Sequence, residues 1–176
     1  MLLVPQSTDK ESQTVKNGNL DLFYGGFCLE QIVGEITSFG ALQKFVNEHK
    51  DDLNFFECIK QYYFELGKSL NYDCKKDSSV LQKGINFSSV DVVWASSEKI
   101  AAAFEIEFGS KDEMLAGIWK LIELEPQYAV LISSSKAKNY SLKEIEQILR
   151  YSHNHKFIET EFLLIEIDKE FFVEIK

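Results

Sequence analysis

The stretch from Val90 to Leu124 reads VDVVW-ASSEK-IAAAFEIEFGS-KDEMLAGIWKLIEL, and it decides the fold. Two apolar segments separated by a short polar break predict a pair of neighbouring antiparallel strands. The segment that follows predicts a helix, because Ser110 and Glu113 form a capping box and Pro126 cannot continue a helix. We therefore expect two strands and then a largely buried helix packed against them.

Three carboxylates lie in the two predicted strands: Asp91 in the first, Glu105 and Glu107 in the second. Successive side chains of a strand point to opposite faces, so the two glutamates share one face. Two such acids repel each other when both are charged, unless they are solvated, share a proton or bind a cation between them. Because Asp91 can approach them from the neighbouring strand, the pattern predicts an oxygen-rich site of the kind that Mg²⁺ selects.

The rest of the chain predicts a mixed α/β fold of three layers, with helices on both sides of a central mixed sheet. We expect a polar N-terminal arm at residues 1–19 and a single α/β domain at residues 20–176. Residues 20–33 read as a hairpin or as a helix after a turn. The other predicted elements are a helix from Thr37 or Ser38 to His49, a helix over residues 53–70 started by Asp51 or Asp52, strands at residues 71–76 and 128–135, a helix at residues 142–152, and two closing strands joined near Asp168 and Lys169.

Length and composition restrict the class of protein. The 176 residues are 45% hydrophobic, which suits one domain with a real core. No apolar run approaches the roughly 18 residues of a membrane span, and no basic segment followed by an apolar one indicates secretion. The three cysteines are widely spaced and read as reduced thiols. We therefore expect a cytoplasmic protein without a membrane partner.

The strand motif V-Asp91-V-V-W followed by F-Glu105-I-Glu107-F resembles the PD-(D/E)XK superfamily of phosphodiesterases, which includes restriction endonucleases and archaeal Holliday junction resolvases. The segment GIWKL, residues 117–121, stands where that family carries a G-L-x-R-L helix. The resemblance covers about the middle two-thirds of the chain. Two positions depart from the motif, because Glu107 occupies the place of the usual lysine and Val90 that of the usual proline.

The resemblance implies a restriction-endonuclease-like core and a DNA endonuclease that depends on Mg²⁺ or Mn²⁺. Asp91, Glu105 and the main-chain carbonyl of Ile106 would hold the metal, and Glu107 would position or deprotonate the attacking water. A glutamate of the preceding helix can join the metal site, and Glu57, ten residues before Gly67, matches that position better than the alternative Glu65. Lys120 either reaches solvent or faces the carboxylates in place of the motif lysine, and Lys111 is a second candidate for phosphate contact.

The charge distribution leaves a second function open. The net charge is −9 and Arg150 is the only arginine, although phosphate contacts rely on Lys and Arg. Residues 133–157 form the one basic segment, which is either a solvated helix face or a DNA-contacting surface. DNA is the expected partner, and a homodimer is one option for assembly. The alternative to a nuclease is a non-catalytic nuclease-fold protein that binds DNA or another partner.

Overall fold

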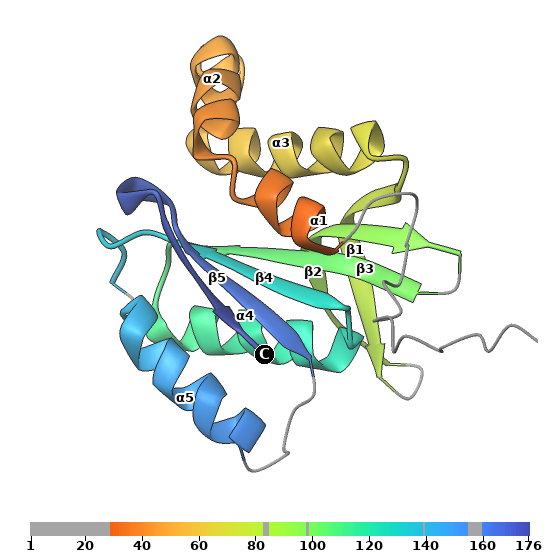
Figure 1. The fold of residues 1–176 in the computed structure, drawn as a ribbon, viewed down its shortest axis with the longest axis vertical. Coiled ribbons are helices and arrows are strands. Elements are labelled where there is room, and N and C mark those ends of the chain that lie inside the picture. Colours follow the sequence, from red (N-terminus) through yellow and green to blue (C-terminus); the bar gives the residue numbers. More distant parts are fainter. Residues whose placement is uncertain (1–28, 83–84, 98, 139, 155–159) are drawn as a thin grey trace, which may run out of the picture.

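The computed structural model describes residues 29–82, 85–97, 99–138, 140–154 and 160–176 (Figure 1). The predicted N-terminal arm and the glycine pair at residues 25–26 lie outside them. The helices are α1 (Leu29–Ile36), α2 (Phe39–His49), α3 (Phe55–Ser69), α4 (Lys111–Leu124), α5 (Leu142–Asn154) and the short 3-10 helix η1 (Ile167–Lys169). The strands are β1 (Asp73–Gln82), β2 (Ile85–Ser96), β3 (Lys99–Glu107), β4 (Tyr128–Ser133), β5 (Glu161–Glu166) and β6 (Phe171–Ile175).

The six strands form one mixed sheet in the order β1-β2-β3-β4-β5-β6. β1, β2 and β3 form an antiparallel meander, as the short polar break after VDVVW predicts. β4 runs parallel to β3, and β5 runs parallel to β4, because α4 and α5 return the chain to the starting edge. β6 then pairs antiparallel with β5. The predicted α/β class with a central mixed sheet is thus observed.

Helices cover both faces of this sheet (Figure 1). α1, α2 and α3 enclose a core that includes Trp94, Phe104 and Ile106, whereas α4 and α5 enclose a second core with Ala103 and Leu131. The alternation along β3 therefore directs Glu105 and Glu107 toward the α4 side. The central strand β4 is buried at all six residues, as expected for a strand covered on both faces.

The helix α3 is fixed closely against β2. A side chain at Gly67 would overlap the indole of Trp94, so only glycine permits this approach. The indole Nε1 of Trp94 donates a hydrogen bond to the main-chain oxygen of Tyr63 at 2.9 Å. This contact joins the helix to the strand that carries Asp91.

Several predicted boundaries are confirmed, and others are wrong. The capping box of α4 forms, with both reciprocal bonds between Ser110 and Glu113. The helix α3 begins later than expected, because Asn54 rather than Asp51 or Asp52 caps it and accepts the amide of Glu57 at 3.0 Å. The expectation that α4 is largely buried is also wrong at Trp119, whose side chain is 59% exposed.

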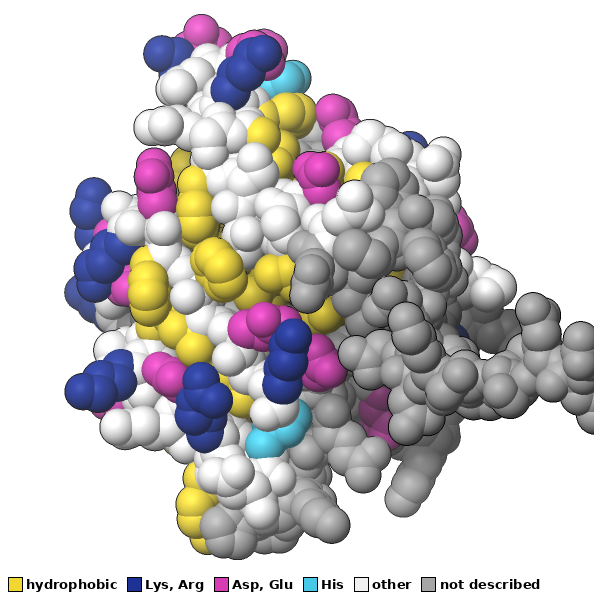
Figure 2. Space-filling view, viewed as in Figure 1, with side chains coloured by type: hydrophobic (Ala, Val, Ile, Leu, Met, Phe, Trp, Pro, Cys, Tyr) yellow, Lys and Arg dark blue, Asp and Glu magenta, His cyan; other side chains and the backbone are white. Residues whose placement is uncertain are grey.

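Figure 2 shows one face of the molecule, on which Lys and Arg side chains lie interspersed with Asp and Glu, with hydrophobic side chains between them. The described side chains on this face do not form a uniformly basic surface for a phosphate backbone. None of the helices in the described part of the chain is both long and apolar enough to span a membrane.

Candidate functional site

The three predicted carboxylates meet where β2 and β3 separate. Regular pairing of the two strands begins at Val92 and Phe104, one residue after Asp91. At this point the Asp91 side chain takes the place of a strand partner, since its Oδ2 accepts the amide of Ile106 at 2.9 Å. The N–H and C=O of one strand residue point to the same side, so the Ile106 carbonyl also leaves β3 toward β2.

Glu105 and Glu107 lie under α4, which passes over them at Gly117. A Cβ at this position would lie 3.0 Å from Glu107 Oε1 and 3.3 Å from Glu105 Oε2. Gly117 therefore opens the helix surface to both carboxyl groups. Glu105 is 1% exposed, which is unusual for an acid in the interior of a sheet.

Lys120, one turn after Gly117 on α4, pairs with the buried glutamate. Its Nζ lies 2.5 Å from Glu105 Oε2 and donates a second bond to the main-chain oxygen of Ser89 at 3.1 Å. Of the two orientations that the sequence left open for Lys120, the ammonium faces the carboxylates and does not reach out to solvent. Its role in place of the motif lysine stays a prediction. The lysine reaches the pair from the helix instead of from the β3 position that Glu107 occupies.

A second lysine reaches the same cluster from the opposite layer. Lys60 of α3 is 5% exposed, and its ammonium forms ion pairs with Asp77 of β1 and, at 3.5 Å, with Asp91 Oδ1. Sequence reasoning missed this residue. A signal was present, because Lys60 stands between Phe56 and Tyr63 at helical spacing and so continues the apolar stripe of its helix.

The burial of these acids shifts their protonation. Burial raises the pKa of Glu105 to about 8, against the opposing effect of the Lys120 ammonium, and the charges of Asp91 and Glu107 add to the rise. Burial likewise raises the pKa of Glu107 to about 7. The pKa of Asp91 is also raised by burial, although the Ile106 amide and both lysines act in the opposite direction. Near neutral pH the glutamate pair therefore holds a proton.

The oxygen atoms of this cluster have the chemistry that a hard cation requires. Glu105 Oε1 is buried and accepts no hydrogen bond from a donor group of the described residues, although Glu105 and Glu107 lie close enough to share a proton. In the observed arrangement, however, no group of three or more acids, histidines or cysteines in the described ranges is placed so that it could hold a metal ion. Lys120 occupies Glu105 Oε2, and it must move before a cation can use both oxygens.

The other predicted site residues lie at the periphery. Glu57 stands in the first turn of α3, one turn before Lys60, and the lysine is the residue that extends to Asp91. Glu65, the alternative to Glu57, is exposed and accepts a bond from Gln61 at 2.8 Å. Lys111 is exposed at the start of α4, with its Nζ 4.4 Å from the centre of the Tyr140 ring.

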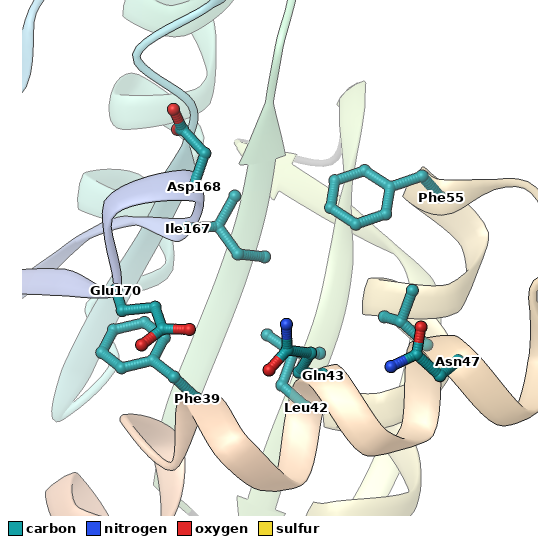
Figure 3. A pocket seen from close by; sticks show the side chains of 9 residues that line it. Phe39, Leu42, Gln43, Asn47, Phe55, Ile167, Asp168 and Glu170 are labelled. Atoms are coloured by element: carbon teal, nitrogen blue, oxygen red, sulfur yellow. The ribbon is translucent and has the colours of Figure 1, made fainter.

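A separate cavity of about 310 Å³ lies between α2, the start of α3 and the β5–β6 connection. Figure 3 shows Phe39 and Leu42 on one side of it, with Phe55 and Ile167 on others. None of the three carboxylates lines this cavity, so it is distinct from the cluster at β2 and β3.

Comparison of the chain with protein-family models, with curated proteins and with solved structures gave no match. The functional proposal therefore rests on the motif and on the geometry of its residues.

Proposed function

We propose that this protein is a divalent-metal-dependent nuclease with a restriction-endonuclease-like core that hydrolyses phosphodiester bonds in DNA. The observation that carries the proposal is the meeting of Asp91, Glu105, Glu107 and Lys120 at one point of the sheet. The element order supports it, because α3, the β1–β3 meander, α4 and the parallel strand β4 follow the order of the core that the sequence motif implies. Fold resemblance alone would not suffice.

The carboxylates and the main chain would share the metal. Asp91, Glu105 and the carbonyl of Ile106 would hold Mg²⁺ or Mn²⁺, both of which prefer oxygen ligands. The proximity of buried Glu105 to Asp91 and Glu107 supports this assignment, because the charges of both neighbours act on Glu105. The bound ion would lower the pKa of a water molecule and offset negative charge on the phosphate.

Glu107 and Lys120 would act on the water and on the phosphate. Glu107, whose carboxyl lies beside that of Glu105, would accept a proton from the attacking water. The water oxygen would bond to phosphorus, and the bond from phosphorus to the leaving sugar oxygen would break. One water proton would pass to Glu107, while the leaving oxygen takes a proton from solvent. Lys120, once released from Glu105, would contact the phosphate as a point charge.

One observation favours the alternative, a non-catalytic nuclease-fold protein that binds DNA or another partner. The two lysines already form ion pairs with Asp91 and Glu105, so the fold satisfies these acids without a metal. In this case the cluster is a buried ionic network with a structural role, and it takes no part in catalysis.

Cleavage assays and metal binding separate the two functions. Purified protein is incubated with single-stranded, duplex and branched DNA in Mg²⁺ or Mn²⁺, beside the variants Asp91→Asn and Glu105→Gln. Glu48→Gln is the matched control, because Glu48 lies on α2 with a side chain that is 56% exposed. We expect cutting by wild type and control, and none by the two site variants. Cutting that persists in both site variants would contradict the proposal, and so would a wild type that cuts none of the substrates. Mn²⁺ binding without cutting would favour the non-catalytic alternative.

A further inference from the structure

The function proposed above assigns no role to Lys60, yet burial of the Lys60 ammonium costs free energy. An ammonium loses its hydration when it is buried, and a single ion pair seldom compensates for that loss. The Lys60 side chain nevertheless lies among apolar residues of α3, with its Nζ 5.7 Å from the centre of the Phe56 ring. The opposing carboxylates keep it charged, since burial lowers the pKa of Lys60 but Asp77, Asp91 and Glu57 together raise it above the ordinary lysine value.

The Lys60 ammonium forms an ion pair with one oxygen of Asp91, and the main chain donates a hydrogen bond to the other. Lys60 Nζ lies 3.5 Å from Oδ1, whereas Oδ2 accepts the Ile106 amide at 2.9 Å. A carboxylate held at both oxygens by two different elements has a defined orientation. Lys60 comes from the α3 layer and Lys120 from the α4 layer, so the Asp91 and Glu105 carboxyl groups are held from opposite sides of the sheet.

We propose that Lys60 is a positioning residue, which orients the Asp91 carboxylate for cation binding and thereby for the hydrolysis proposed above, on which this inference rests. Lys60 acts through Asp91 and contacts neither substrate nor metal. Carboxylates that bind metals are themselves commonly held by further polar partners, and loss of such a partner typically weakens metal affinity by about 10–100-fold. The charged groups that face Asp91 in this arrangement are Lys60, Lys120, Glu105 and Glu107, with Asp77 beyond Lys60.

The competing explanation is that Lys60 only ties α3 to β1 through Asp77. Asp77 offers the matched control, because Asp77→Asn weakens this tie and leaves the contact between Lys60 and Asp91 in place. Lys60→Met removes both contacts and keeps most of the side-chain volume. Lys60→Arg keeps the positive charge, and Lys60→Gln is a smaller neutral change that replaces Lys60→Met if the latter does not fold.

The test uses the full chain and two readouts. The first is the position of the Ile106 amide proton in an NMR spectrum of the metal-free protein at fixed pH, because this proton reports its hydrogen bond to Asp91 Oδ2. The second is the dissociation constant for Mn²⁺ alone. We expect Lys60→Met to move the Ile106 amide and to weaken Mn²⁺ binding by at least about tenfold. Asp77→Asn should change both by much less, and Lys60→Arg should restore most of the affinity.

Three outcomes would overturn either the inference or the proposed function on which it rests. If wild type binds Mn²⁺ but the folded Lys60 variant matches it in affinity and in the Ile106 amide, Lys60 does not position Asp91. The same conclusion follows if Asp77→Asn reproduces both effects of Lys60→Met, because a simple structural tie then explains them. If wild type neither binds Mn²⁺ nor cuts DNA, the proposed function itself fails, and Lys60 keeps only the structural role of orienting Asp91 that the Ile106 amide would still report.

Discussion

Replacement of Glu105 by glutamine should remove a large part of the pH dependence of stability. The folded-state pKa of Glu105 is about 8, against 4.5 for the ordinary side chain, because burial disfavours the charged form. A group with a raised folded-state pKa contributes stability that is fully present below its unfolded pKa and is lost as pH rises through the folded value. For Glu105 this loss falls between about pH 4.5 and 8.

The magnitude follows from the same two values. Midway between these values each pH unit costs about 1.4 kcal/mol of unfolding free energy, and less near either value, so the loss from pH 5 to pH 8 amounts to roughly 3 to 4 kcal/mol. This is a large share of the total stability of a domain of this size. Glutamine carries no charge at any of these pH values, so the variant should lack this loss. It still accepts a bond from Lys120 through its amide oxygen.

Urea unfolding in EDTA at pH 5, 6, 7 and 8 measures the effect. Tryptophan fluorescence follows unfolding, because Trp94 is fully buried and bonded to α3, whereas the second tryptophan, Trp119, is already exposed in the folded protein. We expect the wild-type curve to fall more steeply with pH than the Glu105→Gln curve, while Glu48→Gln follows the wild type. Parallel curves for wild type and Glu105→Gln would refute the reasoning, because the folded protein would then not disfavour the charged form of Glu105.

Three further predictions concern the same region. Glu107→Gln should raise the melting temperature of the metal-free protein at pH 8, because a raised pKa of about 7 makes the Glu107 carboxylate unfavourable above that pH. The variant should also show a smaller increase in melting temperature with Mn²⁺. Equal melting curves with and without Mn²⁺ in both proteins would count against a metal site. Gly117→Ala should displace the carboxyl groups of Glu105 and Glu107 and reduce the increase in melting temperature caused by Mn²⁺. Gly40→Ala, where nothing lies within 4 Å of the added Cβ, should stabilise α2 by up to about 1 kcal/mol. Similar stabilisation of both variants in thermal melts would contradict the close approach of α4 at Gly117. Ser110→Ala should lower the unfolding free energy by about 1 kcal/mol through loss of the capping box with Glu113. The pH dependence between pH 5 and 8 should stay unchanged, because the Ser110 bonds lower the pKa of Glu113 below its ordinary value of 4.5. Urea unfolding checks both parts.

Local sequence signals predicted most of the elements correctly. The strand pair β2 and β3, the capping box at Ser110 and the apolar strand β4 each depend on residues within a few positions of one another. The first residue of α3 could not be predicted from the sequence, because Asp51, Asp52 and Asn54 are all good N-cap residues. Only the packing of the helix selects one of them. The exposure of Trp119 was not predictable from its neighbours, since apolar residues surround most of α4 and periodicity does not say which of them the sheet reaches.

The candidate site could be predicted only in part. The alternation of β3 places Glu105 and Glu107 on one face, and a short connection brings Asp91 beside them, so the three carboxylates follow from local rules. Lys60 does not follow from such rules, because its partners lie 17 residues away at Asp77 and in the next strand at Asp91. A lysine in an apolar stripe indicates an unusual position, but its partners become evident only when the helix is docked on the sheet.

The net charge of the buried cluster determines whether it holds a proton, and it would also determine how the cluster binds the proposed metal. Asp91, Glu105 and Glu107 face the ammonium groups of Lys60 and Lys120, and Lys60 is shared with Asp77, so full ionisation leaves a net negative charge in a poorly hydrated region. Near neutral pH the fold offsets this charge by retaining a proton on the glutamate pair, which is what the raised pKa values of about 8 and about 7 express. A divalent cation would take over this role, and it would have to displace both the proton and the Lys120 ammonium. Metal binding should therefore release protons, and the metal affinity should fall as pH falls. The burial that makes the charged form of Glu105 unfavourable in the metal-free protein is thus the same property that favours a cation beside it.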